Sequence, residues 1–360
     1  MAVGICAGAA DRSGLRNRFR YGAVRLSRAD AISSTAALAA SYLLWFIPAM
    51  GLQFGIVAMG SSLRAIGNFK TGMAVSIGTV ILNMILAPFL IFGWGTGHPM
   101  GVAGAAISTL VAVVVAIIWL TAYFMKDNSI LKLQVTEWTP RLAVWKRMLA
   151  IGLPSGYEFG ITTVYLALVY SITRPFGAAA QAGFGIGMRV VQSLFMPVVA
   201  LGFSVAPVAG QNYGARKEQR VKDTFRDAAG MAVALMLVFT LVCRIAAGPL
   251  IGIFSRDPAV LAVGTEYLRI IAFNYVASGL VFVISSMFQA MGNTVPSLVT
   301  STVRVALVAI LGVILSRLPG FQLRWLWYLP MGSVYVQLLL GLYLLRREYG
   351  RRFNWASAPV

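Results

Sequence analysis

The sequence is poor in the residues that most often bind metals or carry out hydrolysis. Its 360 residues include only 2 cysteines, 1 histidine and 11 acidic residues. Cys6 and Cys243 show neither a CxxC nor a metal-binding spacing, so a disulfide framework and a zinc site are not expected. The lone His98 leaves too little for a Ser-His-Asp or Cys-His catalytic set. We therefore expect a protein that is not an enzyme and that has no metal or other cofactor.

Charge is scarce along most of the chain. Only 11% of the residues are charged, 59% are hydrophobic, and the mean hydropathy is +0.79. No charge occurs from Ala31 to Leu63, and none from Thr71 to Met125 apart from His98. A helix needs about 20 apolar residues to cross a bilayer core, so the second run has room for two spans. No strict alternation indicates a barrel strand. The composition predicts an all-α integral membrane protein.

One apolar stretch occurs twice. Residues 42–68 and 267–293 align without a gap at a constant offset of 225. The identical pairs are Tyr42/Tyr267, Leu43/Leu268, Ser61/Ser286, Ala65/Ala290, Gly67/Gly292 and Asn68/Asn293. The unbroken register and the shared A-x-G-N ending favour a true duplication. Duplicated helical bundles are typical of secondary transporters, whose binding site lies between or within the repeated halves.

The repeat predicts a two-lobed helical bundle with about nine transmembrane helices, three from an incomplete N-lobe and six from a complete C-lobe. The expected spans are 34–63, 72–93, 102–124, 148–172, 178–206, 228–248, 266–290, 296–316 and 327–345. A second copy that starts near Arg147 places the start of the first copy about 78 residues before Met1. We therefore expect a chain that lacks three N-lobe helices, through truncation or a mis-assigned start.

The domains follow from this arrangement. We expect an atypical basic N-terminal segment (1–30), a partial N-lobe (31–125), an inter-lobe cytoplasmic linker (126–147), a C-lobe (148–346) and a basic cytoplasmic tail (347–360). A net charge of +19 would indicate nucleic acid as the partner of a soluble protein. In a membrane protein, basic loops contact anionic headgroups and mark the cytoplasmic side. The expected partner is the lipid bilayer and not nucleic acid, and the expected location is a bacterial-type plasma (inner) membrane, with a multi-pass monomer and a cytoplasmic C-terminus.

Four motifs resemble those of one transporter family. They are GVAGAAIST (101–109), GLPSGYEF (152–159), AAQAGFGIGMRV (179–190) and VAPVAGQNYGAR (205–216). As a set they resemble the multidrug and toxic compound extrusion (MATE) transporters. The resemblance implies twelve helices in two lobes and the export of organic cations or drugs in exchange for protons or sodium, by alternating access. A related flippase for lipid-linked sugars and a truncated inactive or regulatory fragment remain alternatives.

The resemblance also bears on the coupling ion. Sodium-coupled members carry a carboxylate in the fourth helix of the second lobe. The corresponding residues 272–279 read AFNYVASG and contain no acid. We therefore expect protons rather than sodium to drive transport.

Ionisable residues inside a membrane are costly, so each one is a candidate for function. Glu158 is expected about 15 Å from the inner surface, and Arg189 about 16 Å from the outer one, so that the two meet near the midplane of neighbouring helices. One interpretation makes Glu158 the proton-coupling (cation-coupling) carboxylate, and the other makes it half of a structural ion pair with Arg189. The residues expected to line the substrate cavity are Tyr157, Tyr165, Arg189, Asn274 and Arg304. A cavity that includes Arg304 would be net positive and would prefer anions.

Glycines at alternate positions in one predicted span have two possible explanations. Gly183, Gly185 and Gly187 spell G-x-G-x-G rather than the dinucleotide-binding G-x-G-x-x-G. Small residues in an apolar helix let neighbouring helices approach closely. We therefore expect these glycines to serve helix packing and not nucleotide binding.

Overall fold

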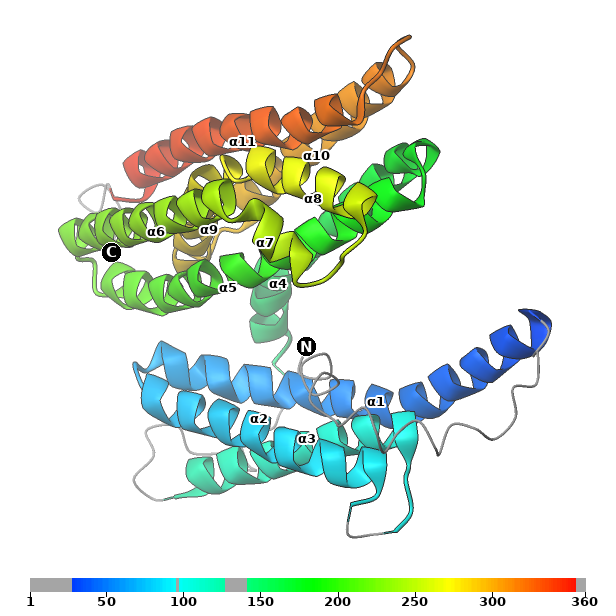
Figure 1. The fold of residues 1–360 in the computed structure, drawn as a ribbon. Coiled ribbons are helices and arrows are strands. Elements are labelled where there is room, and N and C mark those ends of the chain that lie inside the picture. The colour runs from blue at the N-terminus through cyan, green and yellow to red at the C-terminus, as the bar shows by residue number, and fades with distance from the viewer. Residues whose placement is uncertain (1–27, 95–96, 127–140, 354–360) are drawn as a thin grey trace. The chain divides into compact units, whose positions relative to one another are not determined.

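The computed structural model describes residues 28–94, 97–126 and 141–353, and throughout these residues the regular structure is helical (Figure 1). The helices are α1 (Arg28–Ala65), α2 (Phe69–Phe92), α3 (Gly101–Met125), α4 (Leu142–Thr173), η4 (Arg174–Phe176), α5 (Ala178–Gly214), α6 (Glu218–Ile245), α7 (Ala247–Gly252), α8 (Pro258–Ile271), α9 (Asn274–Ala290), α10 (Val295–Ser316) and α11 (Leu323–Arg352). Most of the expected N-terminal segment, linker and tail lie outside the described residues. The all-α prediction is confirmed.

Most of the predicted spans are long and apolar enough to cross a membrane. Seven helices of the described chain meet both requirements, namely α1, α2, α3, α5, α6, α10 and α11. Helices α8 and α9, which meet at a bend of 54°, satisfy both requirements when they are taken together as one span. The remaining predicted span, α4, has 32 residues but is more polar, because it contains Lys146, Arg147 and Glu158. Its length still exceeds the 20 residues that a bilayer core requires.

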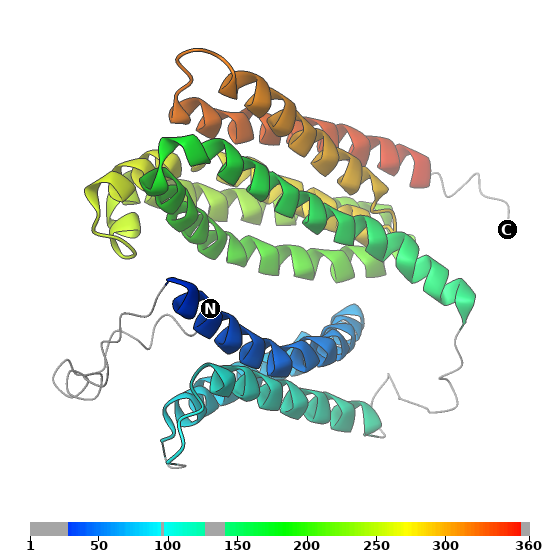
Figure 2. The ribbon, with the colours of Figure 1, turned by 90° about the vertical axis from the view of Figure 1, so that its right-hand side faces the viewer.

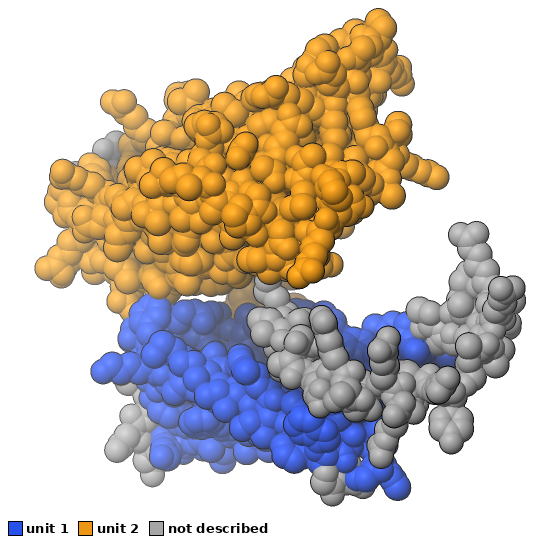
Figure 3. Space-filling model, in the orientation of Figure 1, with its two compact units in different colours: residues 1–139 blue, residues 140–360 orange. Residues whose placement is uncertain are grey.

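The chain folds as two compact units, residues 1–139 and 140–360 (Figure 3). In the first unit, α3 packs against both α1 and α2. The small core of this unit contains Leu63, Val75, Ala116, Leu120 and Phe124. Large apolar side chains on α1 and α2 remain exposed, which is typical of helices that face lipid.

The second unit is built around α5 and α9. Helix α5 packs on α6, α8 and α9, while α10 packs on α4 and α11. Three aromatic side chains join α5, α8 and α11 at the centre of this unit. The ring of Phe184 stacks on Trp327 with centroids 5.5 Å apart, and Tyr267 meets Trp327 edge-on at 4.9 Å. Burial of these rings fixes the packing of the three helices.

The two copies of the repeat end in the same turn. Gly67 and Gly292 have φ angles of 83° and 69°, a left-handed conformation that glycine adopts without strain. The next backbone amides, of Asn68 and Asn293, donate to the carbonyl five residues earlier at 2.9 and 3.0 Å. Both turns are therefore Schellman caps of the preceding helix.

The asparagine side chains make matching contacts as well. Nδ2 of Asn68 donates to the hydroxyl of Tyr123 on α3 at 2.7 Å, and Nδ2 of Asn293 donates to Oε1 of Glu348 on α11 at 2.9 Å. Each partner lies 55 residues beyond its asparagine, so the partners too are separated by the repeat offset. The internal repeat predicted from the sequence is thus present in the structure.

The copies differ near the middle of the repeated span. Helix α1 contains Pro48 and continues through it without a break, and this helix is curved along its length (Figure 2). The position that corresponds to Pro48 in the second copy is Phe273, where the span breaks into α8 and α9. Proline removes one helical hydrogen bond and produces a kink without ending the helix. The second copy makes its bend without proline or glycine, so its sequence gives no sign of the break.

The alternating glycines of α5 prove to be packing positions. A methyl group added at Gly187 would lie 2.4 Å from Cδ1 of Tyr267, and one added at Gly183 would lie 3.0 Å from the backbone nitrogen of Gly264. Helix α5 can therefore lie close to α8 only because these two positions lack a side chain.

We predict that Gly187→Ala destabilises the protein. The ring of Tyr267 is 2% exposed and is held between Phe184 and Trp327, so it has little room to move. Overpacking of this kind costs about 1–3 kcal/mol and should lower the unfolding temperature of the purified chain in detergent. The matched control is Gly230→Ala in α6, where an added methyl meets nothing within 4 Å. Equal unfolding temperatures for the two variants would contradict the packing role.

Candidate functional site

Glu158 lies in the middle of α4, 16 residues after Leu142 and 15 before Thr173. Its side chain is half-buried against α10. The hydroxyl of Ser301 donates to Oε1 at 2.6 Å, and the hydroxyl of Ser297 donates to Oε2 at 3.1 Å. Ser297 and Ser301 are four residues apart and therefore occupy one face of α10. Each carboxylate oxygen thus has one neutral donor.

A chain of hydrogen bonds extends from these serines to two further helices. Ser297 and Ser285 of α9 share a hydrogen bond of 2.7 Å. Nε2 of Gln337 on α11 donates to the Ser301 hydroxyl at 3.0 Å, and Nη1 of Arg304 donates to Oε1 of Gln337 at 3.3 Å. Four helices, α4, α9, α10 and α11, therefore contribute to one polar network inside the second unit.

The far end of the network carries a positive charge over an aromatic ring. The guanidinium carbon of Arg304 lies 5.7 Å from the ring centroid of Tyr165, a favourable cation–π distance. Tyr165 is on α4, about two turns beyond Glu158, and is 7% exposed. Gln337 and Ser301 separate Arg304 from Glu158. The network thus contains one carboxylate and one guanidinium, which are not in direct contact.

Helix α4 is held to α10 by a stripe of hydroxyl groups. Thr294, Ser297 and Ser301 follow one another at intervals of three and four residues, so they lie along one side of α10. The Thr294 hydroxyl donates to the carbonyl of Ile151 at 2.9 Å, three residues before Pro154. The serines continue the contact to Glu158. The seam between the two helices is therefore polar over about two turns.

The expected meeting of Glu158 and Arg189 is not found. No ion pair or side-chain hydrogen bond joins them in the described residues, and Arg189 is exposed on α5. The chief neighbour of α4 is α10 and not α5. Distance along a helix fixes the level of a residue but not the direction of its side chain, which explains the error. The structural ion pair is thereby excluded as the explanation for Glu158 in this structure.

Two other predicted cavity residues also lie outside the network. Tyr157 is 66% exposed and belongs to a different face of α4. Asn274 is 6% exposed at the start of α9, and its Oδ1 atom is buried without a hydrogen-bond partner. Of the six candidates, the structure brings together Glu158, Tyr165 and Arg304.

The neutral members of the network were missed from the sequence. They are Ser285, Ser297, Ser301 and Gln337, which are 2–8% exposed. Hydroxyl groups are common in apolar helices because they can bond to the backbone of their own helix. The helical spacing of Thr294, Ser297 and Ser301 was the available signal, together with the position of the stripe just before Arg304.

The two hydrogen-bond donors to the Glu158 carboxylate are both hydroxyl groups. Within the described ranges, no group of three or more His, Cys, Asp or Glu side chains could hold a metal ion. A carboxylate surrounded by hydroxyls suits a proton or a hard monovalent cation better than a transition metal. The arrangement can hold and release a small positive charge in the middle of a helical bundle.

We predict that Ser297→Ala combined with Ser301→Ala destabilises the second unit. The double variant leaves both carboxylate oxygens of Glu158 without their donors, at a cost of about 1–3 kcal/mol per lost partner. Thermal unfolding of the purified chain in detergent measures the effect. Thr302→Ala is the matched control on α10, because the Thr302 hydroxyl is exposed and bonds only to Leu298 of its own helix. A double variant as stable as this control would show that the network does not support the fold.

Comparison with known proteins gives a consistent family match. Residues 154–314 match the MatE family model. The chain is 30% identical over 270 residues to the probable multidrug resistance protein YpnP of Bacillus subtilis. This alignment covers 74% of this chain and 58% of YpnP. It is 28% identical over 232 residues to the multidrug export protein MepA of Staphylococcus aureus, covering 64% of this chain and 50% of MepA. The chain thus spans about half to three fifths of the curated relatives it matches.

Solved structures show the same fold. An outward-facing multidrug resistance MATE family transporter matches with a TM-score of 0.82 and 20% identity, over 88% of this chain and 70% of that one. The Vibrio cholerae MATE transporter VcmN in its bent form matches with a TM-score of 0.74 and 21% identity, over 87% of this chain and 69% of VcmN. At these identities the likeness establishes the fold alone.

Proposed function

Because this chain carries a MatE domain and is a relative of the MATE multidrug transporters, we propose that it exports organic cations or drugs in exchange for protons, by alternating access. Members of this family are transporters and not enzymes. In this proposal the chain is a multi-pass monomer of a bacterial-type plasma membrane, with its C-terminus in the cytoplasm. The observation that carries the proposal is the way in which Glu158 is bonded.

The donors to Glu158 can serve both of its protonation states. A serine hydroxyl can donate and accept, unlike the guanidinium of an ion pair. Ser301 already accepts from Gln337 and donates to Oε1, so Oε2 is the oxygen that can take the proton. A protonated Oε2 would donate to Ser297, and Ser297 would then donate to Ser285, since either serine can be the donor of that bond. Both carboxyl oxygens of Glu158 and the hydroxyls of Ser297 and Ser301 therefore keep a hydrogen-bond partner in both states.

The protonation state of Glu158 also decides how the site treats a cation. An ionised carboxylate in a low-dielectric helical bundle attracts a positive ligand strongly, and a protonated one does not. Proton uptake would therefore release a bound organic cation, and proton release would favour its binding. This competition is the coupling that an antiporter needs. Arg304 forms no direct ion pair with Glu158, because Ser301 and Gln337 lie between the two groups.

The charge of the network bears on the alternatives. A flippase for lipid-linked sugars would need a strongly basic transport cavity, but the network contains one acid and one base. Residues 272–279 contain no carboxylate that could serve sodium coupling. Among these residues, only Asn274 has a buried side-chain atom without a hydrogen-bond partner in the described chain. Both observations favour proton-driven export of cations.

We predict that Glu158→Gln abolishes transport driven by a pH gradient. Glutamine has nearly the same shape as glutamate but cannot take up or release a proton near neutral pH. The assay is efflux of a fluorescent cation such as ethidium from proteoliposomes that contain the full 360-residue chain, with a pH gradient imposed. Efflux by the variant should fall to the rate of empty liposomes.

Glu218→Gln is the matched control for this experiment. Glu218 is the first residue of α6 and forms an exposed ion pair with Lys222, far from the apolar part of the helices. This variant should keep the full rate. Retained pH-dependent efflux in Glu158→Gln would rule out Glu158 as the coupling group. Efflux that follows a sodium gradient at constant pH would overturn proton coupling, and no efflux from a correctly inserted wild-type chain would favour the inactive or regulatory fragment.

A further inference from the structure

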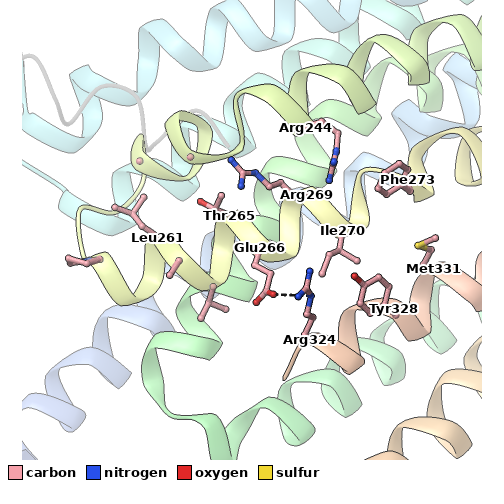
Figure 4. Close-up of a pocket in the computed structure, with 15 residues that line it drawn as sticks. Arg244, Leu261, Thr265, Glu266, Arg269, Ile270, Phe273, Arg324, Tyr328 and Met331 are labelled. Carbon is pink, nitrogen blue, oxygen red and sulfur yellow. Dashed lines mark ion pairs between the residues drawn. The ribbon is translucent and has the colours of Figure 1, made fainter. Parts of the chain in front are cut away.

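The second unit contains a large cavity that is separate from the Glu158 network. Its volume is about 1290 Å³, and its lining comes from α6, α7, α8 and α11 (Figure 4). No member of the Glu158 network belongs to this lining. The cavity lies at the end of the unit where α6 finishes and α11 begins, because Arg244 is the penultimate residue of α6 and Arg324 the second residue of α11. Its size exceeds that of an ordinary small-molecule pocket.

The opening of this cavity is basic. Arg244, Arg269 and Arg324 come from three different helices and line it together with one acid, Glu266 (Figure 4). Nε of Arg324 lies 3.3 Å from Oε1 of Glu266, so this pair is balanced. Arg244 and Arg269 form no ion pair with any acid in the described part of the chain. Two positive charges at the opening therefore remain without a protein counter-ion.

Aromatic and apolar side chains line the cavity beside these arginines. Arg324, Tyr328 and Met331 follow one another along one face of α11, over a distance of about 10 Å from the end of the helix. Ile270 lines the same wall from α8. Phe273, at the break between α8 and α9, lies beneath the guanidinium of Arg244 at 5.0 Å. A ligand that fits both the arginines and the apolar side chains of this lining has an anionic head and an apolar tail.

We propose that this cavity binds the phosphate group of a phospholipid, with its acyl chain along the apolar wall. Arginine is well suited to phosphate because its planar guanidinium donates two parallel hydrogen bonds to the oxygens. Arginines near the ends of membrane helices lie at the level of the lipid headgroups. A free phosphate ion would satisfy the arginines but would leave the apolar wall uncovered. This inference is independent of the proposed transport activity.

We predict that the cavity retains phosphatidylglycerol in preference to phosphatidylcholine. Both lipids carry a phosphate, but the choline group cancels its charge, and the two unpaired arginines should favour the net anion. The 360-residue chain is purified in detergent and supplied with equal amounts of both lipids, and its bound lipids are counted by native mass spectrometry. Arg244→Gln combined with Arg269→Gln should reduce bound phosphatidylglycerol about tenfold. Both side chains are exposed, so the double variant should fold.

Two matched variants and one competing ligand complete the test. Arg317→Gln removes an exposed charge at the end of α10, outside the cavity, and should keep the lipid. Arg269→Lys keeps the charge and should retain part of the binding. Inorganic phosphate is added to lipid-free protein, and its effect on the unfolding temperature is measured. Stabilisation that depends on Arg244 and Arg269, without a preference for phosphatidylglycerol, would support the phosphate site with a free ion as its ligand. Binding of both probes that is unchanged in the folded double variant would overturn the proposal.

Discussion

The structure depends on one constraint, which is that a polar group within the hydrocarbon must find its partner inside the protein. Glu158 meets it with the hydroxyls of two serines on α10, and not with a cation. The choice matters because an arginine partner would stabilise only the ionised form of the carboxylate. A serine hydroxyl can bond to both forms, because it can donate and accept a hydrogen bond. In the proposed mechanism, Glu158 keeps its partners whether or not it carries the proton.

The same constraint explains the features shared by the two copies of the repeat. Each long apolar helix must end in a turn that satisfies its last carbonyl groups, and a left-handed glycine followed by asparagine does so in both copies. The side chain of the asparagine then bonds to the last helix of its own copy, at Tyr123 of α3 in the first copy and at Glu348 of α11 in the second. The turn and its contact therefore persist although most of the apolar residues between them differ. The shared polar contacts, rather than the apolar composition, are therefore the evidence that the two copies have a common origin.

The sequence predicted the helices better than it predicted the site. Long uncharged runs fix the number and approximate limits of the spans, because a bilayer core has a set thickness. The break at Phe273 could not be foreseen, since no proline or glycine accompanies it. The cost of burying a charge drew attention to Glu158 and Arg304, and the structure places both in one hydrogen-bond network. This argument from burial could not identify their neutral hydrogen-bond partners. The expected contact between Glu158 and Arg189 was wrong, because the depth of a residue in the membrane does not fix the direction of its side chain.

In the proposed mechanism, the polar seam between α4 and α10 would connect proton exchange with movement of a helix. Pro154 removes one backbone hydrogen bond from α4 close to the carbonyl that Thr294 holds. Hydroxyl groups of α10 and its N-cap hold α4 on either side of the proline, at Ile151 before it and at Glu158 after it. A bond from serine to a carboxylate is stronger than one to a neutral acid, because the acceptor is charged. Protonation of Glu158 would thus weaken the attachment of α4 next to Pro154, and proline is a common site of helix bending. In the proposed mechanism, the group that takes up the proton is therefore also one of the groups that hold the two helices together, so proton uptake would act directly on the contact between them.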